Sequence, residues 1–151
     1  IMTILDKLIG YGTIELVKIR DGKVVEYRLI RNLIVNKGLE GMAKTFLDLA
    51  SGFKYIALGS SSTAPDTSQT ALGGEIVRAL GTVTTQTTSV TNDTAVVYHT
   101  FTFTSSYVFR EAGLFNASSN GLMACRTTFS DVSVEDGDSL MIKWKIQFTR
   151  S

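Results

Sequence analysis

Residues 139–149 read SLMIKWKIQFT, and the alternation in this stretch decides the fold. Every second position is apolar: Leu140, Ile142, Trp144, Ile146 and Phe148. The positions between them are mostly polar: Met141, Lys143, Lys145 and Gln147. Because successive side chains of a strand point to opposite faces, the stretch predicts a strand with one face in a core and the other in solvent or in an interface.

Seven further stretches predict strands, and short turn signals separate them. Asp21-Gly22 predicts a two-residue hairpin turn, because glycine accepts a positive φ. Thr and Ser together make up 33 of the 151 residues, and Thr favours strands whereas Ser favours turns. The eight predicted strands cover residues 13–20, 23–31, 53–58, 75–91, 95–104, 107–115, 122–129 and 139–149.

One amphipathic α-helix is predicted near residues 37–50, with Asn36 as its N-cap and Ser51-Gly52 at its end. Apolar residues recur at the spacing of one helical face: Leu39, Met42, Ala43, Phe46, Leu47 and Ala50. We expect this stripe to pack into the core against a sheet. The chain is therefore predicted to be mainly β, a two-layer β-sandwich of the jelly-roll type with one helix.

The chain has the length of one domain, and no linker divides it. We expect residues 11–151 to form a single β-sandwich domain and residues 1–10 to form an N-terminal arm. Four apolar residues of the arm have the spacing of a short helix or of a segment laid on a partner: Ile4, Leu5, Leu8 and Ile9. A terminal turn packed on its own domain fits these residues equally well. The segment does not resemble a signal peptide.

Composition and charge exclude several functions. Fifteen Lys and Arg residues balance fourteen Asp and Glu residues, and a formal net charge of +1 predicts no binding of nucleic acid or of an anionic membrane. One His and one Cys exclude a His/Cys zinc site and an intrachain disulfide. No apolar run is long enough to span a bilayer.

The candidates for chemistry each have a structural interpretation that fits better. His99 lies on the apolar face of a predicted strand, which favours a packed histidine over a catalytic one. Cys125, between apolar neighbours, is predicted to be a buried and inert thiol. The acidic residues at 135–138 lack the spacing of a calcium loop, and the Gly- and Ser-rich loop at 59–70 lacks the features of a phosphate-binding loop. We therefore predict no enzyme, no cofactor and no metal site.

Arg110 and Glu111 interrupt an otherwise apolar strand at residues 107–115. Since neighbouring residues of a strand face opposite sides, one of the two charges must point toward a buried layer, where it needs a partner. Arg78 is the predicted counter-ion of Glu111, and the pair is predicted to be structural. An ion pair between subunits is the alternative.

Five blocks of sequence, taken in order, resemble small structural proteins of tailed viruses (bacteriophages), described as capsid decoration (cement) proteins or as short tail-fibre-like proteins. The blocks are NLIVNKGLEGMA (32–43), YIALGSSSTAPDTSQTALGGEIVR (55–78), VTNDTA (90–95), FREAGLFNASSNGLMACRTTF (109–129) and VEDGDSLMIKWKIQF (134–148). Their order and spacing carry the resemblance. The GDSL of the last block precedes a strand and differs in context from the esterase motif.

The resemblance implies a capsid decoration protein on the virion surface that bridges neighbouring subunits of the major capsid protein without covalent bonds. It also implies a homotrimer without catalytic residues or cofactors. A tail-fibre or baseplate protein involved in host attachment is the alternative. A small carbohydrate-binding module or hydrolase is a third hypothesis, and it requires a row of exposed aromatic residues with paired carboxylates.

Overall fold

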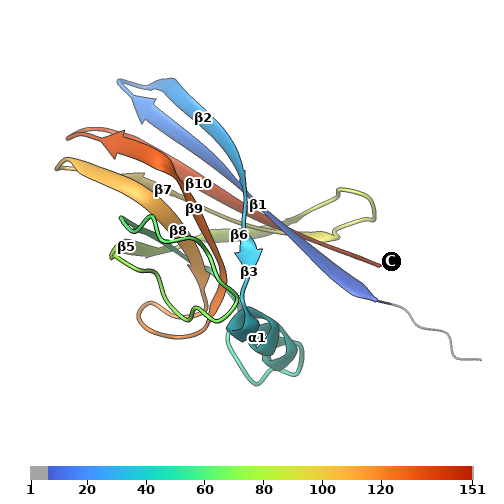
Figure 1. The fold of residues 1–151 in the computed structure, drawn as a ribbon. Helices are drawn as coiled ribbons and strands as arrows, with labels where there is room; N and C mark the ends of the chain where they lie inside the picture. Colours follow the sequence, from blue (N-terminus) through green and yellow to red (C-terminus); the bar gives the residue numbers. More distant parts are fainter. Residues whose placement is uncertain (1–6, 151) are drawn as a thin grey trace, which may run out of the picture.

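The computed structural model describes residues 7–150 and shows a mainly β chain with one helix (Figure 1). The ten strands in this range are β1 (Leu8–Arg20), β2 (Lys23–Arg31), β3 (Leu33–Ile34), β4 (Tyr55–Gly59), β5 (Glu75–Leu80), β6 (Thr82–Gln86), β7 (Thr94–Thr102), β8 (Tyr107–Phe115), β9 (Met123–Val134) and β10 (Ser139–Arg150). The helix α1 covers Asn36–Phe46.

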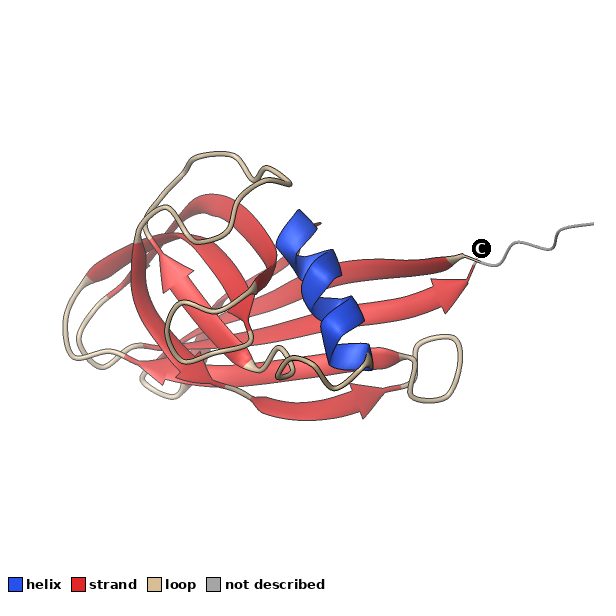
Figure 2. Cartoon of the chain, turned by 90° about the horizontal axis from the view of Figure 1, so that it is seen from below, coloured by secondary structure: helices blue, strands red, loops and turns tan. Residues whose placement is uncertain are grey.

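The strands form two five-stranded antiparallel sheets, which confirms the predicted two-layer β-sandwich. The order in the first sheet is β2-β1-β10-β7-β6, and the order in the second is β3-β9-β8-β4-β5. The helix crosses the strands on one side of the sandwich (Figure 2). The jelly-roll subclass stays a prediction.

The core lies between the two sheets and is built from alternate residues of the strands. On β10 the predicted inward residues Leu140, Ile142, Trp144 and Ile146 are buried, and Phe148 is half-buried at the edge of the core. Full burial of an apolar side chain of this size stabilises a fold by about 1.5–3 kcal/mol. The alternation in the sequence therefore identifies the core face of this strand.

β1 and β10 form a long antiparallel ladder that reaches from the pair Leu8–Arg150 to the pair Ile19–Ser139. One end of this ladder projects beyond the other strands (Figure 1). The structure places residues 8–10 within β1, so the strand begins before the predicted boundary between arm and domain. The first six residues of the predicted arm lie outside the described part of the chain.

The predicted hairpin turn at Asp21-Gly22 is present between β1 and β2. Both residues adopt positive φ angles, 51° and 73°. Glycine reaches this region without a steric penalty and Asp tolerates it, which is why the pair makes a tight hairpin. The turn sets the antiparallel pairing of β1 with β2, in which Leu16 lies opposite Arg28.

The helix differs from the prediction in its ends and in what it buries. It ends at Phe46, and its N-cap is Val35 without a side-chain cap hydrogen bond, so the predicted Asn36 cap is wrong. The buried residues of α1 are Gly38 and Gly41. A Cβ at Gly38 would collide with the Ala124 carbonyl of β9, because the helix backbone packs directly on that strand.

The predicted long strand at 75–91 is two strands in different sheets. β5 belongs to the second sheet and β6 to the first, and the chain crosses between them at Gly81. The Gly81 amide donates a hydrogen bond to the Lys54 carbonyl at 2.7 Å, and a Cβ at Gly81 would lie 2.6 Å from the Val97 side chain. Only glycine fits this crossing without displacing Val97.

Candidate functional site

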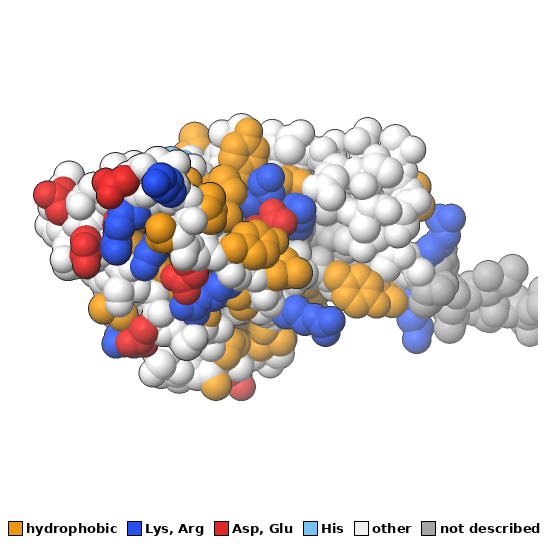
Figure 3. Space-filling model, turned by 90° about the horizontal axis from the view of Figure 1, so that it is seen from above, with side chains coloured by type: hydrophobic (Ala, Val, Ile, Leu, Met, Phe, Trp, Pro, Cys, Tyr) orange, Lys and Arg blue, Asp and Glu red, His pale blue; other side chains and the backbone are white. Residues whose placement is uncertain are grey.

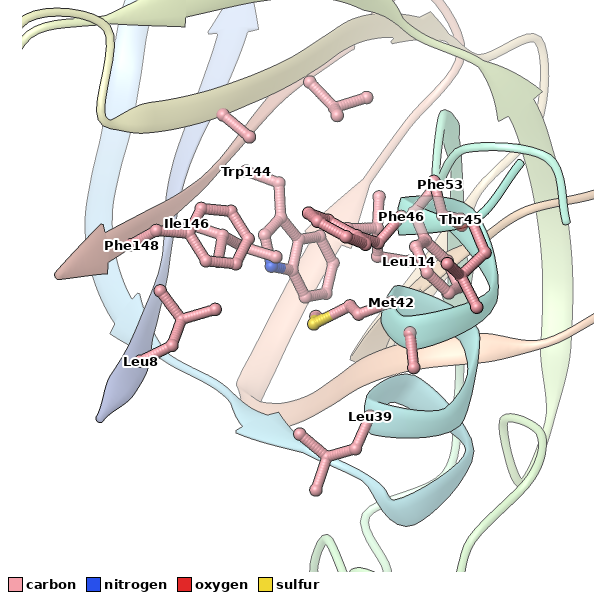
Figure 4. Close-up of a pocket in the computed structure, with 14 residues that line it drawn as sticks. Leu8, Leu39, Met42, Thr45, Phe46, Phe53, Leu114, Trp144, Ile146 and Phe148 are labelled. Carbon is pink, nitrogen blue, oxygen red and sulfur yellow. The ribbon is translucent and has the colours of Figure 1, made fainter. Parts of the chain in front are cut away.

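An apolar groove lies between α1 and the β10 side of the first sheet (Figure 4). Its volume is about 850 Å³. Thirteen of the fourteen residues that line it are apolar, and the fourteenth is Thr45. We call this hollow the α1 groove.

The floor of the α1 groove is formed by residues of the hydrophobic core. Val97, Leu114, Trp144 and Ile146 line the groove and are nevertheless almost fully buried in the sandwich. The Trp144 indole N–H donates a hydrogen bond to the Asn32 side-chain oxygen at 3.0 Å. Because the polar atom of the ring is bound there, the part of Trp144 that meets the groove is apolar.

The rim of the groove consists of large apolar side chains in solvent. Their exposed fractions are 77% for Leu8, 60% for Leu39, 89% for Phe46 and 63% for Leu47. Phe46 extends from the last turn of α1 toward the middle of the groove (Figure 4). Such a cluster is unusual on a monomer surface, where scattered apolar residues are normal and contiguous patches mark interaction sites.

This groove corrects the prediction that the helical stripe is packed in the core. Met42 is half-buried against the core, but Leu39, Ala43, Phe46 and Leu47 are exposed. The physical reason is that α1 packs closely through its glycines, Gly38 on β9 and Gly41 on Phe53 and Leu122, so the leucine and phenylalanine side chains project past the sheet. The spacing of the stripe predicts the helix correctly. It does not reveal which of the apolar side chains are buried against the sheet.

The charged side chains of α1 are paired with each other and stay out of the groove. Lys37 and Lys44 donate hydrogen bonds to Glu40 at 2.6 and 2.8 Å. These hydrogen bonds lower the pKa of Glu40 to about 2, and the bond from Lys37 has the larger effect. None of the three residues lines the α1 groove. Within residues 7–150, the groove therefore offers shape and apolar contact and no charge to select a polar ligand.

Of the four predicted interaction residues, the structure brings one into the groove. Leu8 stands at the rim, at the far end of β1. Ile9 follows it in β1 and is half-buried, and it is not among the residues that line the groove. Ile4 and Leu5 lie outside the described residues.

A buried ion pair lies on the outer face of the second sheet, under the loop of residues 60–74. Glu111 accepts hydrogen bonds from Arg126 Nη2 and Nε at 2.8 and 3.0 Å, and both side chains are almost completely buried. The loop supplies three more donors to the same carboxylate, the amides of Ser61, Gly73 and Gly74 at 3.2, 3.0 and 2.6 Å. We call this group the Glu111 cluster.

The Glu111 cluster satisfies its own polar groups. Arg126 Nη1 donates to the Thr63 carbonyl at 2.7 Å and to the Gln69 side-chain oxygen at 3.1 Å. Leu72 of the same loop packs with Ala57, Phe115 and other buried residues beside it. The loop is therefore fixed by a buried charge pair and an apolar anchor, and the cluster is structural.

The predicted pair of Arg78 with Glu111 is not formed; the structure gives each residue a different partner. The Arg78 side chain pairs with Glu75 and donates hydrogen bonds to the carbonyls of Ala117 and Asn120, both at 2.9 Å. Glu111 pairs with Arg126 because β8 and β9 are neighbours in which Gly113 lies opposite Arg126, two residues from Glu111. Residues on one face of paired strands at this diagonal are within reach of each other.

His99 and Cys125 both occur in strands. His99 is half-buried on β7, with its ring edge-on to Phe101 at a centroid distance of 4.7 Å. Cys125 is buried in β9, and burial raises the pKa of its thiol to about 12. A thiol with this pKa is almost entirely protonated at neutral pH, so Cys125 is a poor nucleophile.

A second exposed apolar surface lies on the outer face of β1 and β2, formed by Tyr11, Tyr27 and Leu29. We call it the β2 surface. It differs from the groove because charges are interspersed: the Tyr27 hydroxyl donates to Glu15 at 3.2 Å, and Lys145 lies 3.6 Å from Glu15. Figure 3 shows hydrophobic and charged side chains mixed in this way on the upper face of the molecule.

No helix within residues 7–150 is long and apolar enough to cross a membrane. In the same range, no group of three or more His, Cys, Asp or Glu residues is placed to hold a metal ion. No protein-family model, curated protein or solved structure matches the chain.

Proposed function

We propose that this chain is a structural protein of a tailed-virus particle, a capsid decoration protein that stabilises the shell by bridging neighbouring capsid subunits. The observation that carries the proposal is the α1 groove, whose rim of Leu8, Leu39, Phe46 and Leu47 is an apolar surface in solvent, as expected of a protein that functions within an assembly. The resemblance of five sequence blocks to such proteins supports the same assignment.

The mechanism is burial of surface between copies of repeated subunits. A specific protein–protein contact of standard size buries about 1,600 Å² in total. On a shell the same contact recurs at every equivalent position, and a chain that contacts two neighbours binds far more tightly than through either contact alone. The groove and the β2 surface lie on opposite faces of the first sheet, which suits a protein that contacts neighbours on two sides.

The proposed partner is the major capsid protein, and the proposed location is the outside of the virion. The test is the copy number of this chain in purified particles of the virus that encodes it, measured by quantitative mass spectrometry. A decoration protein is present at about the abundance of the major capsid protein. A few copies per particle would instead identify a tail-fibre or baseplate protein, and absence from the particle would overturn the proposal.

A binding assay sharpens this test. Purified chain is added to particles assembled without it, and bound chain is separated by sedimentation. We expect binding that saturates at a fixed ratio to the shell protein and that raises the temperature at which the shell releases its genome. Binding without saturation, or no change in the release temperature, contradicts a stabilising role.

A further inference from the structure

We infer that the α1 groove is covered by a second copy of this chain, with the two grooves facing each other about a twofold axis. The inference rests on the proposed function only in assigning the groove to assembly. It assigns the groove to a second copy of the chain and leaves contact with the major capsid protein to other surfaces. In this arrangement the rim of each copy, above all Phe46, enters the groove of the other. Each groove is therefore incomplete without the second copy.

The exposed apolar area agrees with what a stable dimer needs. The four rim side chains expose between 60% and 89% of their surface. An aromatic side chain buries about 150–250 Å² and a leucine somewhat less, so the rim offers on the order of 500 Å² per copy before the groove walls are counted. A standard interface takes about 800 Å² from each partner. The largest apolar patch of a soluble monomer covers about 300–600 Å² and often has a function, and the rim alone reaches this range.

The shape of the surface favours a twofold arrangement. A protruding group, Phe46, and a hollow floored by Trp144 and Ile146 lie side by side on the same surface (Figure 4). A twofold contact uses one patch on both copies and needs such self-complementarity, whereas a ring of three copies needs two different patches on each copy. The trimer implied by the sequence resemblance therefore requires contacts outside the groove.

The chemistry of the groove also favours a second copy. Among the described residues that line the groove, none has a charged side chain, and Thr45 has the one side chain of a polar residue. Its best partner is an equally apolar surface, and the rim of an identical groove is such a surface. The β2 surface fits less well, because docking it there would bury the Glu15 and Lys145 charges without new partners.

The test is the oligomeric state of the full chain, measured by sedimentation equilibrium over a range of concentrations. We expect a dimer for the wild type, and for Phe46→Ser a dissociation constant raised by about 30-fold or more, as for a central contact residue. Leu29→Ser is the matched control, since Leu29 is 65% exposed on the β2 surface. It should leave the dimer unchanged. Leu47→Ser provides a second groove variant, and near-ultraviolet circular dichroism verifies that each variant is folded.

A spin label locates the contact. Thr45→Cys places a reactive thiol in the groove wall, while the native Cys125 is buried and stays unlabelled. Across a twofold axis through the groove, the two labels lie close together and give one short distance by pulsed electron resonance. A label at Thr85→Cys, on the exposed edge strand β6, should give a longer distance.

The outcomes separate the inference from the proposed function. A wild-type monomer at tens of micromolar, a trimer, or a dimer that Phe46→Ser leaves intact overturns the twofold groove contact. If Phe46→Ser instead abolishes binding to particles while the wild type is monomeric, the groove binds the shell, and the proposed function stands without the inference. A groove dimer that is absent from particles supports the inference and contradicts the proposed function.

Discussion

The Glu111 cluster and the α1 groove are two surfaces of the same sandwich that the chain treats in opposite ways. Over Glu111 and Arg126 the loop of residues 60–74 closes completely, and five hydrogen bonds reach one carboxylate. Over Trp144 and Ile146 no segment within residues 7–150 closes the groove, and Phe46 stands in solvent.

The difference follows from the free energy that the folded chain loses when each surface lacks its contacts. A buried charge without partners destabilises a fold by several kcal/mol, so the cluster must be complete within one chain. An exposed apolar surface costs far less in the monomer and is compensated when a partner covers it. The contrast therefore assigns stability to the cluster and assembly to the groove, and four substitutions test that division.

The largest expected effect is the loss of one partner in the cluster. Arg126→Met leaves Glu111 buried and without its counter-ion, and it should lower the free energy of unfolding by about 3–5 kcal/mol. Urea denaturation followed by circular dichroism measures the change. Lys37→Met is the control, because the Lys37 and Glu40 side chains are 48% and 37% exposed and exposed ion pairs contribute about 0–1 kcal/mol. Equal losses in the two variants would show that the cluster is no more important than a surface pair.

The second prediction concerns the glycine that lets the loop approach. A Cβ at Gly59 would meet the Glu111 carboxylate and lie 2.5 Å from the Gly74 carbonyl oxygen. Gly59→Ala should therefore push the loop away and cost about 1–3 kcal/mol, the usual cost of overpacking. At Gly52 a Cβ meets the Lys54 side chain at an ordinary 3.5 Å, so Gly52→Ala should change stability by less than about 0.5 kcal/mol. Proteolysis within residues 60–74 should increase in the first variant only.

The sequence predicts the strands better than it predicts the two surfaces. The alternation of β10 identifies its core face, and Asp21-Gly22 identifies a hairpin, because both signals are local. The partner of Glu111 depends on the register between β8 and β9, which alternation does not reveal, so the sequence predicts Arg78 where the structure has Arg126. The sequence predicts the helical stripe, but the contacts of Gly38 with β9 and of Gly41 with Phe53 decide how α1 lies on the sandwich, and these contacts are long-range.

The third prediction concerns the ion pair of Arg20 and Asp138, whose burial is intermediate between that of the Glu111 cluster and that of the groove rim. Two hydrogen bonds from Arg20 at 2.8 Å, together with the Glu135 amide, lower the pKa of Asp138 from 3.8 to about 2. A carboxyl group with a lowered pKa in the folded state stabilises the fold above its unfolded pKa, and this contribution is lost as the pH falls. The free energy of unfolding should therefore decrease between about pH 4 and pH 2.

Asp138→Asn isolates this contribution, since the amide does not titrate. Urea denaturation at pH 6, 4, 3 and 2 should show a weaker pH dependence for Asp138→Asn than for the wild type. The Asp138 side chain is 2% exposed and that of Arg20 is 40% exposed, so added salt should reduce the difference only in part. An identical pH dependence in the two proteins would exclude a role for this pair in acid unfolding.

The smallest expected effect is at the rim of the groove, and it separates assembly from stability most directly. Phe46→Ala removes the largest exposed ring of α1, yet at protein concentrations low enough to separate the copies it should change the free energy of unfolding by less than about 0.5 kcal/mol, because the ring is in water. At high concentration Phe46→Ala should be less stable than the wild type, because association stabilises the folded wild-type chain by mass action and the variant associates less. A loss above about 1 kcal/mol at low concentration would mean that Phe46 packs within its own chain, and the groove would then be part of the core.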